Sequence, residues 1–227
     1  MTSTDDTAAS SPGSPDASVH RIVLASASPA RLATLRSAGI DPEVVVSGVD
    51  ESAVTLTDPA ALAVELAVRK ARAVADRVGA AMVIGCDSVL EFGGRVHGKP
   101  ADPDEARQRW RSMRGGSGVL HTGHCLIDTA TGREVPRSAR TVVHFASVSD
   151  QEIDAYVGSG EPLQVAGAFT IDGLGGAFIS GIEGDPHTVV GISLPLLRLM
   201  FAELGVLWSD LWGASNETVT VVEERTQ

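Results

Sequence analysis

The chain has 227 residues, 43% of them hydrophobic, and a formal net charge of −11. This length suits one domain with a substantial core, and the acidic balance argues against nucleic acid or an anionic membrane as a partner. No apolar run approaches the roughly 20 residues that a membrane-spanning helix requires. Cys86 and Cys125 lack the spacing of a zinc site or a disulfide framework, so we expect both to be reduced and buried in a cytoplasmic protein.

The two ends of the chain differ in composition from its middle. Residues 1–18 are rich in Ser, Asp, Pro and Ala, and they lack the basic and apolar segments of a signal peptide. We predict a disordered tail there and a second, loose polar tail over residues 213–227. A single folded domain is then expected over residues 19–212.

In chain order, the first predicted elements are a short strand and a helix joined by small residues. The apolar residues 21–25 predict the strand, and Pro29 suits the first turn of a helix that runs to about residue 38. Ser28 is the expected N-cap of this helix, and Gly39 is the expected stop. A second strand is predicted over residues 42–48.

The next segments predict two helices with a strand between them. Asp58-Pro59 is expected to begin a long amphipathic helix that extends to about residue 78. The apolar run over residues 80–92 predicts a buried strand, interrupted at residues 86–88. A polar helix is predicted over residues 103–113.

The second half of the chain opens with a hairpin and closes with a helix. Residues 119–148 predict two strands with a turn between them, and Ser149 with Glu152 predicts a capping box for a helix to about residue 157. Residues 158–191 are glycine-rich and irregular, which is typical of a binding surface. The closing amphipathic helix is expected over residues 193–204. This alternation predicts an α/β fold with a mixed sheet.

The junction between the first strand and the first helix predicts an anion site. Small side chains let a phosphate approach the free N–H groups of the helix start, where the macrodipole adds positive charge. Ser26 and Ser28 can donate from their hydroxyls, and Arg31 from its guanidinium. An ordinary capped helix is the alternative, since the segment matches neither a Walker A loop nor a dinucleotide fingerprint.

Four further charged side chains are candidates for the same site. Asp87 lies inside an apolar run, so it is either a general base or metal ligand, or a buried acid paired with an arginine for structure. A hairpin at Gly93-Gly94 would bring Lys99 back beside Asp87, and a solvated turn is the alternative. Glu51 and Lys70 either face this site or belong to a surface loop and a solvated helix face.

The histidines carry no expected metal site. His121 and His124 would face opposite sides of their strand, so they cannot form a metal pair. His144 is expected to pack across the sheet.

Six blocks of sequence, spread over about residues 21–205, together resemble the Maf family. They are, in order, "LASASPARLATLRSAGI", "SGVDES", "LAVRKARAVA", "VIGCDSVLEFGGRVHGKP", "YVGSGEPLQVAGAFTIDGLGG" and "IEGDPHTVVGISLPLL". Members of that family were first described as septum-formation inhibitors and are nucleoside triphosphate pyrophosphatases.

The resemblance implies hydrolysis of a nucleoside triphosphate between its α- and β-phosphates, with Mg²⁺ or Mn²⁺ as the divalent cation. It implies an elongated central mixed sheet flanked by helices, with a cleft between two lobes, similar to the inosine triphosphate pyrophosphatases. It also implies a homodimer and makes residues 19–212 the catalytic domain. A non-catalytic nucleotide-binding regulator of cell division is the alternative.

The family's motifs imply a role for each candidate residue. Asp87 matches the aspartate taken as the base that activates water, and Glu51 matches a metal-side carboxylate. Whether Asp87 acts as the base or mainly as a metal ligand stays open. The positions implied to hold phosphate are Ser26, Arg31, Lys70 and Lys99.

Three positions that are thought to tune base recognition depart from the family's patterns. Ala30 replaces an arginine, Ser88 a threonine, and Asp172 a glutamine of the branch that acts on dTTP and UTP. The chain matches neither that branch nor the one acting on 7-methyl-GTP. We therefore expect a shifted or broadened base preference, because the carboxylate of Asp172 only accepts hydrogen bonds where a glutamine also donates.

Overall fold

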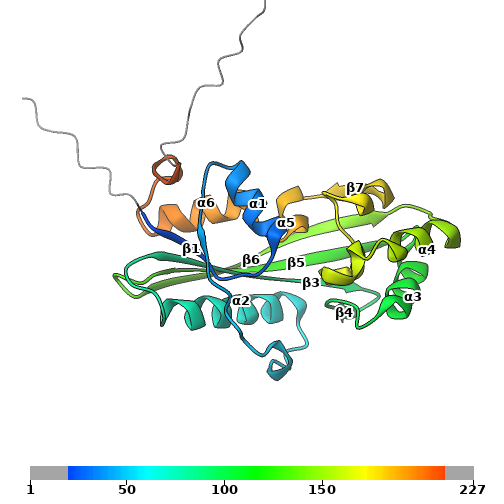
Figure 1. The fold of residues 1–227 in the computed structure, drawn as a ribbon, viewed down its shortest axis with the longest axis horizontal. Coiled ribbons are helices and arrows are strands. Elements are labelled where there is room, and N and C mark those ends of the chain that lie inside the picture. The colour runs from blue at the N-terminus through cyan, green and yellow to red at the C-terminus, as the bar shows by residue number, and fades with distance from the viewer. Residues whose placement is uncertain (1–19, 213–227) are drawn as a thin grey trace, which may run out of the picture.

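A seven-stranded sheet runs along the centre of the computed structural model, which describes residues 20–212 (Figure 1). Its strands are β1 (Ile22–Leu24), β2 (Glu43–Val44), β3 (Met82–Phe92), β4 (Arg95–His97), β5 (Ser117–Asp128), β6 (Arg133–Phe145) and β7 (Ile179–Glu183). The order is β2-β1-β3-β5-β6-β7, and β4 pairs with part of β3. β1 is parallel to both of its neighbours, and the remaining pairs are antiparallel, so the predicted mixed sheet is confirmed.

Helices cover both faces of the sheet, as the predicted fold class requires. One face carries α2 (Pro59–Ala75), and the other carries α1 (Pro29–Ser37) and α6 (Leu194–Glu203) (Figure 1). At one end of the sheet lie α3 (Pro103–Met113) and α4 (Asp150–Gly158). The short α5 (Pro186–Val190) follows β7. No helix among residues 20–212 combines the length and apolar character needed to cross a bilayer.

Capping residues in the sequence predicted correctly where the helices begin. The Ser28 side chain accepts a hydrogen bond from the Arg31 N–H, and the Asp58 side chain accepts one from the Ala61 N–H. Both predicted hydrogen bonds of the α4 capping box are present. These caps satisfy N–H groups that a helix start leaves free, which is why the helices begin where the sequence predicts.

The structure corrects three expectations about the strands. β3 is continuous, so the interruption predicted at residues 86–88 is wrong: β5 pairs with this stretch throughout. β2 spans two residues rather than the predicted 42–48. The glycine-rich region 158–191 also contains β7 and α5, which the sequence analysis did not predict. Both predicted tails, residues 1–18 and 213–227, lie outside the described residues.

Small residues let α2 approach the sheet closely. A Cβ atom added at Gly85 of β3 would overlap the backbone carbonyl of Ala67, and one added at Gly123 of β5 would overlap that of Ala63. The apolar core on this side includes Ala67 and Cys125, and Ala63 is fully buried as well. This short separation brings the α2 backbone down onto β3 beside Gly85.

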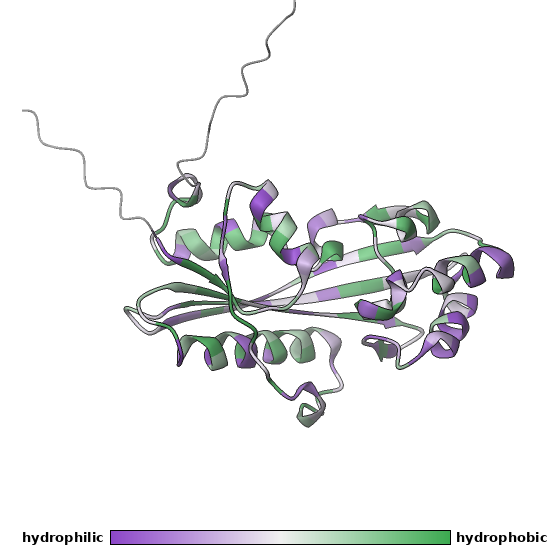
Figure 2. Ribbon diagram, in the orientation of Figure 1, coloured by the Kyte–Doolittle hydropathy of each residue, from purple (hydrophilic) through white to green (hydrophobic). Residues whose placement is uncertain are grey.

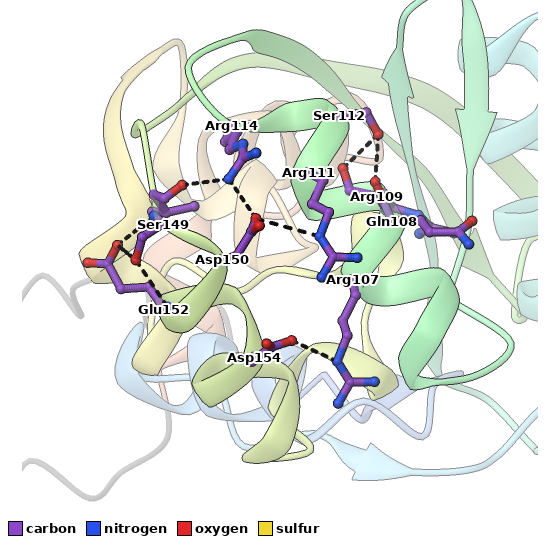
Figure 3. A network of polar contacts seen from close by, with 11 residues as sticks. Arg107, Gln108, Arg109, Arg111, Ser112, Arg114, Ser149, Asp150, Glu152 and Asp154 are labelled. Atoms are coloured by element: carbon purple, nitrogen blue, oxygen red, sulfur yellow. Dashed lines mark hydrogen bonds and ion pairs between the residues drawn. The ribbon is translucent and has the colours of Figure 1, made fainter.

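The end of the molecule with α3 and α4 has its own core and a charged surface. Trp110 is fully buried there and packs edge-on against Phe145 and Tyr156. Figure 2 shows that hydrophilic residues gather on α3. Arg114 of this region pairs with Asp150 at 2.8 Å, within the network drawn in Figure 3. The cluster around Trp110 is thus separate from the cluster under α2 and from a third cluster, which includes Leu197 and Phe201 of α6.

Candidate functional site

The candidate site lies where one edge of β3 has no neighbouring strand. β1 pairs with β3 as far as Ile84, and β4 pairs with it only from Leu90 onward. Among the described residues, no strand covers this edge of β3 over residues 85–89. The continuous β3–β5 pairing holds the backbone of this gap rigid, and Asp87 and Ser88 lie within it.

Asp87 points to the α2 face and meets Lys70 there. The Lys70 Nζ lies 2.5 Å from the Asp87 Oδ1 and 2.6 Å from the Glu51 Oε1. Lys70 and Asp87 are both buried, whereas Glu51 is exposed on a 3-10 turn, Glu51–Ala53. One ammonium therefore links two carboxylates that the sequence separates widely, and the cluster keeps a net negative charge.

The burial of Lys70 follows from the close approach of α2. Its helical neighbours behave differently: Arg69 pairs with Glu65 and Arg72 with Glu134, all on more open surface. The alternative prediction, that Lys70 lies on a solvated helix face, is therefore wrong. The partner of Asp87 is also a lysine, Lys70, and not the arginine that the alternative prediction assumed.

Burial raises the pKa of Asp87 above the usual carboxyl value, while the charges of Lys70 and Arg31 act in the opposite direction. A carboxylate with a raised pKa holds a transferred proton more readily than an exposed one. Such groups occur often in active sites. The environment of Asp87 is thus suited to accept a proton from water.

Arg31 lies on the other side of the gap and contacts only neutral acceptors. Its Nε donates to the Gly191 carbonyl at 2.7 Å, and its Nη1 and Nη2 donate to the hydroxyl oxygens of Ser26 and Ser88, each at 3.1 Å. No ion pair of Arg31 occurs among the described residues. Since a guanidinium has five N–H donors, two remain for a ligand.

Ser26 adds a further free donor next to Arg31. Its oxygen accepts from the Arg31 Nη1 and from the Ser28 N–H at 3.2 Å, which leaves its own hydroxyl hydrogen available. Arg31 and Ser26 together present donors and a full positive charge at the start of α1. Phosphate and carboxylate oxygens are the groups that such a set binds best.

The remaining predicted residues are less closely assembled. The β3–β4 register would bring Lys99 opposite Ser88 if it continued, but β4 ends at His97, opposite Leu90. The chain then turns at Gly98, whose carbonyl accepts hydrogen bonds from Gly167 and Arg109. The Lys99 side chain is exposed, and it makes no hydrogen bond or ion pair within residues 20–212.

The three positions expected to tune base recognition lie on three different elements. Ala30 is half-buried in the first turn of α1, and Asp172 is exposed in the loop before a 3-10 helix, Leu174–Phe178. Ser88 is half-buried and is bonded to Arg31. The structure therefore joins one of the three to the phosphate-type donors directly.

Two carboxylates could hold a divalent cation. Glu51 and Asp87 converge on one point, the Lys70 Nζ, so their oxygens can reach a common cation. The described residues contain no cluster of three or more His, Cys, Asp or Glu side chains that could hold a metal by themselves. Mg²⁺ commonly takes one or two carboxylates and completes its shell with water and substrate phosphate, so this pair fits such an ion.

The network beneath Arg31 was missed by the sequence analysis. Thr122 of β5 is fully buried, contacts the Ser88 hydroxyl at 2.9 Å and donates to the Thr188 carbonyl at 2.9 Å. A threonine in an apolar strand carries no motif that would reveal this role. Asp185 could have been found, because Asp185-Pro186 repeats the cap signal of α2 and begins α5.

His124 lies fully buried on the Arg31 side of the sheet, while His121 contacts Glu91, which confirms that the two histidines do not form a pair. The His124 Nε2 accepts a hydrogen bond from the Ser193 N–H at 2.8 Å, so the neutral ring carries its proton on Nδ1. Burial, with a contribution from the charge of Arg31, lowers the pKa of His124 to about 4.

Comparisons with known proteins show the family of this chain. The sequence model of the family described as "Maf-like protein" matches residues 21–204. A protein of Salinispora tropica is 59% identical over 203 residues, which cover 87% of this chain and 90% of the relative. A protein of Streptomyces coelicolor is 57% identical over 200 residues, with 87% and 97% covered. Both relatives are named nucleoside triphosphate pyrophosphatase, and this chain belongs to the Maf-like protein family.

Proposed function

We propose that this chain is a nucleoside triphosphate pyrophosphatase, which hydrolyses the bond between the α- and β-phosphates to give a nucleoside monophosphate and pyrophosphate. The observation that carries the proposal is the buried Asp87 in the gap of β3, with Lys70 and Arg31 on its two sides. The names of the relatives favour catalysis over a non-catalytic nucleotide-binding regulator.

The reaction requires a water molecule as nucleophile and the removal of its proton. The Asp87 carboxylate accepts that proton directly, or it orients the water while holding a cation; both roles use the same ionised group. Lys70 holds the Oδ1 of Asp87 at 2.5 Å, and the second carboxylate oxygen would then act on the water. Pyrophosphate then leaves with the bridging oxygen.

The substrate's charge is offset by the cations around the gap. Arg31 and Ser26 bind phosphate oxygens with the donors that their internal hydrogen bonds leave free. Lys99 approaches the phosphate tail from the exposed segment after β4, and Lys70 adds positive charge next to Asp87. Charge neutralisation and in-line positioning are the main requirements of phosphoryl transfer.

Glu51 and Asp87 would hold Mg²⁺ or Mn²⁺ together with phosphate oxygens. Such an ion, when bound, neutralises developing charge on the phosphates and lowers the pKa of a coordinated water. Glu51 lies on an exposed turn, so it can shift its contact from Lys70 without disturbing the core.

Base preference is expected to differ from that of the branch acting on dTTP and UTP. Ala30 removes a cationic side chain from the first turn of α1, and Asp172 is a pure acceptor at an exposed loop position. We also expect a homodimer in the cytoplasm.

The proposal is tested by separating the products of a panel of canonical and modified nucleoside triphosphates. We expect monophosphate and pyrophosphate in equal amounts, loss of turnover in EDTA and recovery with Mg²⁺ or Mn²⁺. Release of inorganic phosphate with a diphosphate would contradict cleavage between the α- and β-phosphates. A clear preference for dTTP and UTP would contradict the shifted base preference.

A further inference from the structure

We propose that Thr122 is a positioning residue that fixes the Arg31 guanidinium through the Ser88 hydroxyl. This inference rests on the proposed role of Arg31 in binding phosphate. Thr122 and Ser88 face each other in the β3–β5 register, and Thr122 is fully buried. It lies one strand further from the open edge of β3 than Ser88.

The directions of the hydrogen bonds follow from the donors that are available. The Thr122 hydroxyl donates to the Thr188 carbonyl, which can only accept. Thr122 has a single hydroxyl hydrogen, so in its 2.9 Å contact with Ser88 it must accept. Ser88 therefore donates to Thr122 and turns a lone pair of its oxygen toward the Arg31 Nη2, at 3.1 Å.

This order makes Ser88 a committed acceptor for Arg31. A serine hydroxyl rotates freely unless its hydrogen has an acceptor, and Thr122 supplies that acceptor. Without it, the Ser88 hydrogen could point toward the guanidinium and repel it. Thr122 thus selects the one hydroxyl orientation that holds Arg31.

The other anchor of Arg31 depends on the same segment. The Arg31 Nε donates to the Gly191 carbonyl, and Thr122 donates to the Thr188 carbonyl three residues earlier, within α5. Gly191 has a φ of +117° and a Cβ there would lie 3.0 Å from the Arg31 Nε, so the residue must be glycine for this approach. Thr122 therefore contacts both supports of the guanidinium, Ser88 and the α5 end.

The arrangement also bears on specificity. Because the hydrogen of Ser88 is donated to Thr122, Ser88 has no hydrogen to offer a nucleobase. Its influence on substrate choice then passes through the position of Arg31.

The experiment compares Thr122→Val with Thr122→Ser. Valine keeps the shape and removes both hydrogen bonds, and serine keeps the hydroxyl. We expect Thr122→Val to lower kcat/KM for the preferred triphosphate roughly three- to tenfold, mainly through KM, since one buried hydrogen bond is lost on each side. Thr122→Ser should restore most of the wild-type value.

Thr129→Val is the matched control. The Thr129 hydroxyl likewise lies within hydrogen-bond distance of backbone carbonyls, those of Gly79 and Ala81, and it accepts from the Ala81 N–H. Thr129 follows the far end of β5 and has no contact with the Arg31 network. Its loss should lower thermal stability without changing KM. An equal change of KM in Thr129→Val would overturn the inference.

Two readouts separate positioning from a general loss of structure. In a double-mutant cycle with Arg31→Gln, the effect of Thr122→Val should vanish, because the guanidinium it positions is gone. The ¹⁵N NMR signal of the Arg31 Nε–H should exchange faster with solvent in Thr122→Val than in the wild type. Additive effects in the cycle, or unchanged exchange, would overturn the inference. The NMR measurement needs no turnover, so it stands even if the proposed activity fails.

Discussion

The charged side chains at the α3–α4 end of the sheet and those at the gap of β3 are compensated in different ways. Around α3 and α4, Arg107 lies 2.8 Å from Asp104. Arg107 also lies 3.0 Å from Asp154, and Arg114 pairs with Asp150 (Figure 3). These pairs are largely exposed. Arg31, at the gap of β3, has three neutral acceptors instead and keeps its whole positive charge.

The difference separates charges that support the fold from charges reserved for a ligand. An exposed pair is worth about 0–1 kcal/mol and is screened by salt. A partly buried guanidinium held by hydroxyl and carbonyl oxygens is pre-oriented, and its charge is still unneutralised when an anion arrives. In the same region, Lys70 is surrounded by two carboxylates, which leaves a negative point for a cation.

The largest expected effect is the loss of turnover in Asp87→Asn. The amide cannot accept the proton of water, so kcat should fall by about 10²–10⁴-fold. Asp154→Asn, which removes a carboxylate of the α3–α4 network, is the control and should leave kcat unchanged. Pyrophosphate release at saturating substrate measures both variants. A kcat within tenfold of wild type in Asp87→Asn would show that Asp87 does not activate the water.

The second expected effect is acid destabilisation through His124. Its folded-state pKa is about 4, below the usual value of 6.5, so the unfolded chain binds the proton first as the pH falls. The contribution of His124 to the free energy of unfolding is complete above pH 6.5. It is lost as the pH falls from 6.5 to 4, and the total loss is roughly 3 kcal/mol. Urea unfolding across this range measures it.

His124→Gln should flatten that pH dependence, whereas His144→Gln should not. His144 bridges Ser117 and Glu183 on neighbouring strands at the sheet surface, as the expected cross-strand packing implies. If the free energy of unfolding depends on pH in the same way in wild type and in His124→Gln, another group controls acid unfolding.

The third expected effect separates the two kinds of arginine directly. Arg31→Gln removes charge-assisted hydrogen bonds to phosphate, so kcat/KM should fall by about 10–100-fold. Arg107→Gln should leave kcat/KM unchanged, because its charge is already offset by Asp104 and Asp154. Steady-state kinetics with one triphosphate measure kcat/KM for both variants. Similar losses of kcat/KM in both would contradict the difference between the two kinds of arginine.

The smallest expected effect is on the stability of the α3–α4 end. Arg114→Gln should lower the free energy of unfolding by about 1 kcal/mol or less, and the difference from wild type should shrink in 1 M NaCl. Denaturant titrations at low and high salt measure it. A larger loss that persists in high salt would mean that Asp150 and Arg114 contribute more than an exposed pair.

Local signals in the sequence determined most of the elements. Ser28 and Asp58 placed two helix starts, and the 103–113 helix was predicted with its observed bounds, because capping depends on neighbours a few residues away. The residue pattern supplied the candidate phosphate-binding and acidic residues, and the family resemblance implied their roles and added the positions expected to tune base recognition. The strand prediction failed at residues 86–88 for a physical reason: polar residues suggested a break, while pairing with β5 keeps the strand intact.

What the sequence by itself determined is most of the elements and the residue types that the site would need. Only the tertiary structure decided that Lys70 joins Glu51 and Asp87, that Arg31 keeps neutral partners, and that Thr122 lies beneath Ser88. These contacts depend on where β1 and β4 end along β3 and on how closely α2 approaches Gly85 and Gly123. Both are set by packing between distant segments, which no local pattern in the chain encodes.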